Sequence, residues 1–175
     1  MKKLISMILT VALFLAFAAF ALGSGEDENT TVTKNGSETQ ETSSTANERK
    51  EVHVGETLNV NELKITYDSA EKWSSDNMFI QPGDGNQYIR LHLSVANDTG
   101  SDQYIGSYDF SCYADGEKCE ILYTGDDTLS FDSISSGRKT SGYVYFEVPA
   151  NAKEIEVEYE TSIWSNKKAY FIVKL

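Results

Sequence analysis

Apolar and polar residues alternate along the chain after residue 50. From Tyr88 to Ala96 every second residue is aliphatic, whereas Arg90, His92 and Ser94 between them are polar or charged. This period of two is typical of a strand with one buried face, because a helix would repeat its apolar positions every three to four residues. The same alternation recurs over residues 63–67, 143–148 and 154–160. The pattern therefore predicts an all-β domain over residues 51–175, built from antiparallel strands.

The dipeptide Asp115-Gly116 predicts a β-hairpin with a two-residue turn, because both residues readily adopt the positive φ angles that such a turn requires. If Ala114 faces Glu117, the register follows for the whole hairpin. It sets Tyr113 opposite Lys118, and on the apolar face it predicts three further pairs: Cys112 with Cys119, Phe110 with Ile121, and Tyr108 with Tyr123.

Cys112 and Cys119 are the two cysteines of the chain. Opposed residues of paired strands have Cα atoms about 4.5–5.5 Å apart, which a disulfide accepts, and exported proteins meet oxidising conditions. We therefore predict a disulfide between Cys112 and Cys119. In a strict two-residue hairpin the pair occupies a hydrogen-bonded position, where the bond is more strained, and two free buried thiols are the alternative.

Residues 1–23 are typical of a signal peptide or an N-terminal anchor. Lys2 and Lys3 precede a long apolar run, and Ala19-Phe20-Ala21 offers the small-residue site that a signal peptidase cuts. The uncut run is long enough to span a thin bilayer, so retention as an anchor is the alternative. Lipoproteins carry a cysteine where this chain has Ser24, so we predict no lipid. An extracellular or cell-surface location follows, with membrane contact only through this segment if it stays uncut.

Residues 24–50 predict a disordered spacer. Ten of these 27 residues are Ser or Thr, and Val32 is the only large aliphatic side chain. Such a composition buries too little apolar surface to offset the entropy that is lost on ordering. The chain therefore divides into the leader, this spacer and one folded domain.

Charge and composition exclude several classes of function. The formal net charge of −12 argues against nucleic acid as a partner, because the chain repels phosphate backbones. His53 and His92 have no Cys or Met spacing that would complete a copper or zinc shell. The acidic turns at 76–86 and 126–127 match no EF-hand loop, and no Gly-x-Ser-x-Gly nucleophile motif occurs. The sequence predicts no metal, no cofactor and no enzyme.

Ordered landmarks in the folded domain resemble a bacterial family. They are Val54-Gly55-Glu56-Thr57, Leu63-Lys64-Ile65-Thr66, Tyr88-Ile89-Arg90-Leu91, Asp109-Phe110, Asp115-Gly116 and Gly142-Tyr143-Val144-Tyr145-Phe146-Glu147-Val148-Pro149. The family comprises secreted and lipoprotein immunoglobulin-like domains of unknown function, and it is related to the mycobacterial immunoprotective extracellular antigen. The resemblance covers nearly all of residues 51–175 and implies an immunoglobulin-like antiparallel β-sandwich. It carries over no catalytic residues.

Aromatic residues of the folded domain are candidates for a binding surface. Tyr113, Tyr143 and Tyr145 fall on strand faces opposite the predicted core, where rigid amphipathic rings suit a protein or a sugar. Met78 and Phe79 lie in a long loop of the kind that often carries binding sites. We therefore predict a binding surface from these five residues. The alternative is that the rings cover sheet edges or pack under the loop.

These inferences together predict an exported, non-catalytic binding or interaction module, whose partner is a protein or glycan at the cell surface. A structural or envelope-maintenance protein without a dedicated ligand is the alternative. A contiguous exposed patch of aromatic rings would favour binding, and full burial of the rings would favour the structural role.

Overall fold

The computed structural model describes residues 30–34, 49–123, 125–162 and 167–175. The predicted leader, residues 1–23, lies outside these ranges. Within them, no helix is long and apolar enough to cross a membrane. The helical segment in the described ranges is the short 3₁₀ turn η1, Ser107–Asp109. The other elements there are strands, so the prediction of an all-β domain is confirmed.

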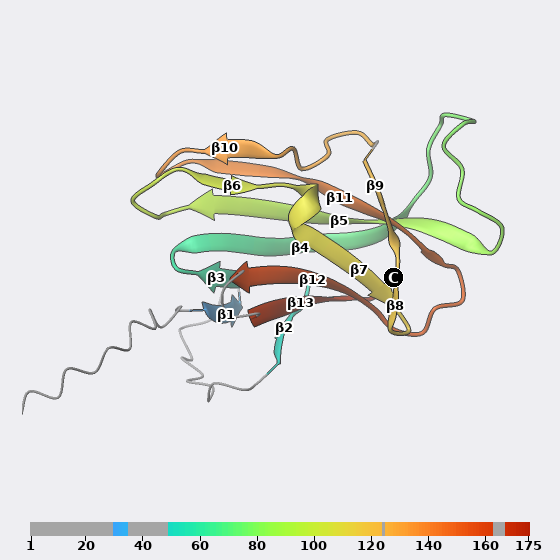
Figure 1. Ribbon diagram of the computed structural model, residues 1–175, viewed down its shortest axis with the longest axis horizontal. Helices are drawn as coiled ribbons and strands as arrows, with labels where there is room; N and C mark the ends of the chain where they lie inside the picture. The colour runs from blue at the N-terminus through green and yellow to red at the C-terminus, as the bar shows by residue number, and fades with distance from the viewer. Residues whose placement is uncertain (1–29, 35–48, 124, 163–166) are drawn as a thin grey trace, which may run out of the picture.

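The strands form two sheets that pack face to face, with a two-stranded ribbon beside them (Figure 1). The first sheet has the order β1-β3-β4-β5-β11-β9, with bounds Thr30–Lys34, Glu56–Val60, Leu63–Trp73, Asn86–Asn97, Lys139–Pro149 and Glu120–Leu122. The second has the order β2-β13-β12-β7-β8, with bounds Lys50–Val52, Lys167–Val173, Ile155–Ser162, Phe110–Ala114 and Glu117–Lys118. The ribbon pairs β6, Gln103–Ile105, with β10, Asp132–Ile134. Among these pairs only β2 and β13 run parallel.

Alternating apolar residues of both sheets meet between them and form the core. Leu91 and Leu93 of β5 are fully buried, and Val157 of β12 and Phe171 of β13 join the same cluster from the second sheet. Each side chain of this kind contributes about 1.5–3 kcal/mol when it is fully buried. The buried side chains that recur at every second position of β5 and β12 therefore stabilise the packing of the two sheets.

Tyr67 of β4 lies within this core and has no hydrogen-bond partner for its hydroxyl among the described residues. Its ring is fully buried and meets Phe171 edge to face, with ring centroids 5.6 Å apart. Burial raises the pKa of the phenol, so the group stays neutral. Because an unpaired buried hydroxyl costs about 1–3 kcal/mol, we expect Tyr67→Phe to raise the free energy of unfolding by about 1 kcal/mol. Urea unfolding checks this expectation, and a clear loss of stability would contradict it.

The predicted hairpin at Asp115-Gly116 is confirmed at its turn. Asp115 and Gly116 have φ angles of 50° and 84°, and Tyr113 pairs with Lys118 as expected. Two backbone N–H groups just before β12, those of Lys153 and Glu154, donate to the Asp115 carboxylate. Aspartate therefore both adopts the turn conformation and ties the turn to the neighbouring strand.

Beyond Cys119 the predicted register is wrong. The chain crosses to the first sheet, where Ile121 of β9 pairs with Phe146 of β11. Phe110 of β7 pairs with Tyr159 of β12 instead of with Ile121. Both Phe110 and Ile121 face the core from their respective sheets, so alternation alone does not distinguish a long hairpin from a crossing between layers.

Strand β1 lies within the predicted spacer, so disorder is wrong for Thr30–Lys34. The strand pairs with β3 along its whole length, and Val32 packs against the core. Three of its five residues are threonine, and β-branched residues suit an edge strand even where the flanking composition is polar. Averaging over the whole spacer concealed this short segment. The rest of the spacer up to residue 48 lies outside the described ranges.

Candidate binding surface

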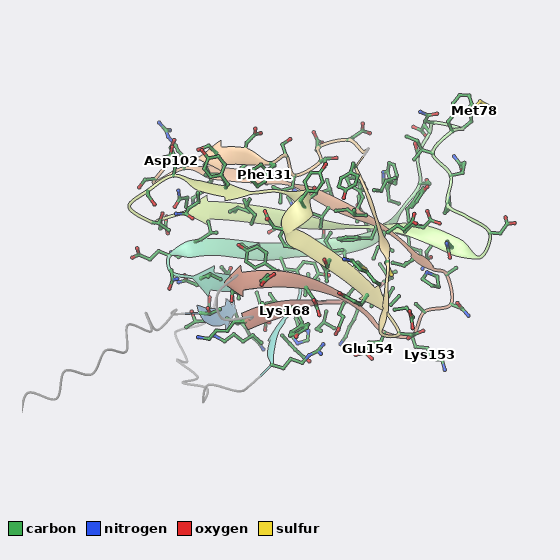
Figure 2. All side chains as sticks on the ribbon, viewed as in Figure 1. Met78, Asp102, Phe131, Lys153, Glu154 and Lys168 are labelled. Carbon is green, nitrogen blue, oxygen red and sulfur yellow. The ribbon has the colours of Figure 1, made fainter. Side chains whose placement is uncertain are left out.

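The structure places the five predicted binding residues at separate sites. Met78 and Phe79 are exposed in the loop between β4 and β5, and Figure 2 shows Met78 at the outer end of that loop. Tyr113 is half-buried on the outer face of the second sheet, and Tyr143 is half-buried on the outer face of the first. Tyr145 is fully buried. These residues do not form one surface, and Tyr145 is covered by other parts of the chain rather than open to a partner.

Hydrogen bonds within the 74–85 loop organise its tip. The Asn77 side-chain oxygen accepts from the Phe79 N–H at 3.0 Å, and the Asn77 carbonyl accepts from Gln81 Nε2 at 3.0 Å. At the base, Glu147 Oε1 accepts from the Gly83 N–H at 2.8 Å. These hydrogen bonds hold the loop that carries Met78 and Phe79.

Tyr145 is buried because the chain after β9 folds back over its ring. Gly125 lies against the ring so closely that a Cβ there would be 2.5 Å from Tyr145 Cζ. The Tyr145 hydroxyl donates to the Asp126 carbonyl, and Trp73 meets the ring edge to face with centroids 4.9 Å apart. Alternation correctly places Tyr145 on the outer face of β11, but it does not reveal a loop that covers that face.

We expect Gly125→Ala to lower the free energy of unfolding by about 1–2 kcal/mol, because the added methyl group must displace the Tyr145 ring or lift the loop. Gly100→Ala is the matched control, since a Cβ at Gly100 meets nothing within 4 Å. The measurement is guanidinium chloride unfolding of both variants. Equal midpoints would refute the packing of this loop on Tyr145.

Charged and aromatic side chains contact one another on the outer face of the first sheet. The Arg90 guanidinium lies 4.1 Å from the centre of the Tyr143 ring and pairs with Glu71 at 2.6 Å. The ring of His92 meets Tyr143 edge to face, with centroids 4.7 Å apart. Tyr143 is therefore already engaged within the chain.

Asp68 lies at a β-bulge in β4, between Tyr67 and Ser69, and contacts His92 and Ser94 of β5. His92 Nδ1 is 2.9 Å from Asp68 Oδ2, and the Ser94 hydroxyl donates to the same oxygen at 2.7 Å. A nucleophilic serine needs its hydroxyl on the imidazole, whereas this one is bonded to the carboxylate. The arrangement suits polar recognition rather than acyl transfer. Sequence reasoning missed Asp68 because the bulge brings an extra residue to this position.

Four aromatic side chains are exposed in two stacked pairs, carried by β6, η1 and the chain next to β9 and β10. Tyr104 stacks on Phe131 with centroids 5.8 Å apart, and Tyr108 stacks on Tyr123 at 4.6 Å. Their exposed fractions are 61%, 56%, 69% and 51% in that order. We refer to these four residues as the aromatic face. The predicted strand pairing of Tyr108 with Tyr123 on an inner face is wrong: the two rings meet at the surface, one from η1 and the other from the chain after β9.

Close backbone packing supports the aromatic face. Gly106 lies against Phe131, and an added Cβ would be 2.7 Å from Phe131 Cα. The Ser107 N–H and hydroxyl both donate to the Leu129 carbonyl, at 3.1 and 2.9 Å. The Asp109 carboxylate accepts from the Gly106 N–H at 2.7 Å, and burial raises the pKa of this carboxyl group. The four rings therefore project from a well-supported backbone.

A shallow depression of about 350 Å³ lies elsewhere on the outer face of the first sheet. Thr66, Ser94 and Ser141 line it in register across three strands, together with Lys139. Its lining offers hydroxyl groups and one ammonium group but no carboxylate, so it contains no acid–base pair of carboxyl groups.

In the part of the chain that the structure describes, no group of three or more His, Cys, Asp or Glu side chains could hold a metal ion.

The structure holds Cys112 and Cys119 as free cysteines, with their side chains 4.1 Å apart. The predicted disulfide is therefore not formed in it. The Cys119 N–H donates to the Cys112 carbonyl, so the two cysteines form a hydrogen-bonded pair of the antiparallel ladder. The Cα atoms of such a pair lie farther apart than those of a non-hydrogen-bonded pair. Burial raises the pKa of both thiols, so they are protonated at neutral pH.

Comparison with known sequences finds one family. The family described as a domain of unknown function, DUF4352, matches residues 52–169. No curated protein matches the chain significantly.

Solved structures share the fold at low sequence identity. YcdA of Bacillus subtilis, described as a putative lipoprotein, is 14% identical with a TM-score of 0.57, and the match covers 67% of this chain but 38% of YcdA. The yjhA protein of Bacillus subtilis is 11% identical with a TM-score of 0.56, covering 70% of this chain and 98% of that one. The secreted protein MPT63 of Mycobacterium tuberculosis is 18% identical with a TM-score of 0.50, covering 73% and 98%. These likenesses concern the fold, and they confirm the sandwich and the mycobacterial resemblance expected from the sequence.

Proposed function

The chain belongs to the DUF4352 family, and from that premise and the aromatic face we propose that it is an exported, non-catalytic binding module. The N-terminal leader supports export. So does the likeness to one protein described as secreted and to another described as a putative lipoprotein. A partner at the cell surface follows from that location.

The aromatic face is the observation that carries the binding role. Tyrosine and phenylalanine rings bury a large area at a partner and lose little conformational entropy, so they dominate many interfaces. Here four such rings remain more than half exposed, although the same chain buries Tyr67, Tyr145 and Phe171 completely. Exposed apolar area that is grouped and held on a rigid backbone is typical of an interaction site.

The position of the aromatic face also suits a module held by its N-terminal side. Figure 1 places the β6–β10 ribbon along the upper edge of the sandwich, whereas β1 and β2 lie along the lower edge. Figure 2 shows Phe131 and Asp102 on that upper edge. A partner can therefore approach the aromatic face without contacting β1 or β2.

Photo-cross-linking in the cells that make the protein tests this proposal. The full chain carries benzoylphenylalanine in place of Tyr108, and a matched control carries it in place of Val54, which is exposed to a similar degree. We expect irradiation to give a discrete adduct from position 108 and none from position 54. Absence of an adduct at 108, or the same adducts from both positions, would favour a structural protein without a dedicated ligand.

A further inference from the structure

We propose that the aromatic face binds a positively charged, arginine-rich segment of a protein partner. The inference rests on the proposed binding function and adds the chemistry of the partner. Three observations carry it: the sign of the surrounding charge, the lack of basic partners for two of the carboxylates within the described residues, and the way in which this chain binds its own arginines.

The segment that carries the aromatic face is strongly acidic. From Asp98 to Gly137, both included, the sequence has nine acidic residues and one basic residue, Lys118. Asp132 follows Phe131 directly, and Asp102 is exposed two residues before Tyr104. Anionic partners such as nucleic acid or a phosphate polymer are repelled by such a surface, whereas a cationic segment is attracted and steered towards it.

Carboxylates beside the aromatic face lack basic partners within the described residues. Ion pairs elsewhere neutralise several acidic side chains, including Glu71 by Arg90, Asp98 by Lys64 and Glu158 by Lys168. No such pair within the described ranges involves Asp102 or Asp132. Their negative charge therefore remains available to groups from outside the chain.

The chain itself shows how a tyrosine and a carboxylate together hold arginine. The Arg49 guanidinium lies 4.0 Å from the centre of the Tyr170 ring and also pairs with Glu156. Arg90 uses the Tyr143 ring and Glu71 in the same way. Guanidinium groups stack on aromatic rings and bind carboxylates through paired hydrogen bonds, so the two contacts reinforce each other. The aromatic face offers four exposed rings, with Asp102 two residues before Tyr104 and Asp132 directly after Phe131.

Two separate stacked pairs favour a protein segment as the occupant. Each pair presents exposed rings on which a guanidinium group can stack, as Arg49 and Arg90 stack on Tyr170 and Tyr143 within the chain. A partner with several cationic side chains on one backbone can contact both pairs at once. The first contact then raises the effective concentration of the partner at the second pair and so increases the affinity. The expected partner is therefore a basic stretch of protein.

Fluorescence anisotropy with the full chain, purified in a non-ionic detergent, tests the inference. The probe is a labelled synthetic peptide of alternating arginine and serine, and the control peptide carries citrulline in place of each arginine. We expect the arginine peptide to bind at least tenfold more tightly than the citrulline peptide, and high salt to weaken the binding. Equal affinity of the two peptides would overturn the inference.

Paired variants locate the binding on the protein. We expect Asp102→Asn with Asp132→Asn to weaken binding of the arginine peptide roughly fivefold to tenfold, and Tyr108→Ala with Tyr123→Ala to weaken it at least as much. Asp76→Asn with Asp84→Asn is the charge-matched control, because it removes two exposed carboxylates from the 74–85 loop. An equal loss in this control would show that the peptide senses net charge only, and would overturn the inference.

The two proposals fail in distinguishable ways. If neither peptide binds while the adduct from position 108 persists, the binding module stands and the cationic partner is wrong. If the adduct is also absent, both proposals are wrong.

Discussion

Phe171→Ala is expected to lower the free energy of unfolding by about 3–5 kcal/mol. Phe171 is fully buried, and its ring meets Tyr67 of the first sheet at 5.6 Å and Phe110 of the second at 6.0 Å between centroids. Alanine would leave a cavity at the point where the two layers touch. Because small β domains are stabilised by only about 5–15 kcal/mol, we expect much of the protein to unfold on mild warming.

Ile172→Ala is the matched control for this variant. Ile172 is the next residue of β13 but lies on the opposite face, where it is half-buried. We expect it to lose about 1 kcal/mol or less, because the surface it leaves is partly in water already. Thermal and urea unfolding of both variants give the comparison. Similar losses would mean that β13 does not present Phe171 to a core between two sheets.

Gly142→Val is expected to lower the free energy of unfolding by about 3 kcal/mol, and Gly142→Ala by somewhat less. Gly142 lies in β11 next to a parallel bridge between Thr128 and Tyr143, and a Cβ there would be 2.7 Å from Leu129 Cα. The neighbouring atoms belong to backbone, so no side-chain movement relieves the clash. Two hydrogen bonds of 2.8 Å hold this bridge: the Leu129 N–H donates to the Tyr143 carbonyl, and the Tyr143 N–H donates to the Asp127 carbonyl.

The same substitution is expected to disturb the aromatic face. The Leu129 carbonyl accepts both hydrogen bonds of Ser107, so displacement of Leu129 loosens η1, which carries Tyr108. Gly100→Ala serves as the control again, since its Cβ meets nothing. Differential scanning calorimetry measures the stability, and the near-ultraviolet circular dichroism of the stacked tyrosines reports the face. An unchanged midpoint for Gly142→Val would contradict the close approach of the two backbones.

The long strands could be predicted from the sequence because each buries one face along its whole length. The alternation matches the burial from Ile89 to Val95 in β5 and from Ile155 to Tyr159 in β12, and the positive φ angles of Asp115 and Gly116 follow from the dipeptide. Alternation identifies a face but not the sheet to which a strand belongs. The crossing at Cys119 was missed for that reason, although the inward direction of Phe110 was predicted correctly.

The candidate binding surface was less predictable because it depends on short elements and on loops. Strands β6 and β10 are three residues each, too short for a periodic pattern, so Tyr104 and Phe131 gave no signal. Tyr145 was included in the predicted binding surface because nothing in the sequence indicates that Gly125 would bring a loop onto its ring. Gly142 interrupts the alternating pattern of β11, and a glycine within a strand indicates that another backbone segment packs closely against it.

The most direct test of the binding role is tyrosine labelling of the same full chain in two states. Hydroxyl-radical footprinting compares the purified chain with the chain on the cells that produce it. We predict that Tyr108 and Tyr123 are modified readily in the purified chain and are protected on cells, while the half-buried Tyr113 on the second sheet is modified equally in both. Equal modification of Tyr108 and Tyr123 in both states would contradict the claim that the aromatic face engages a partner.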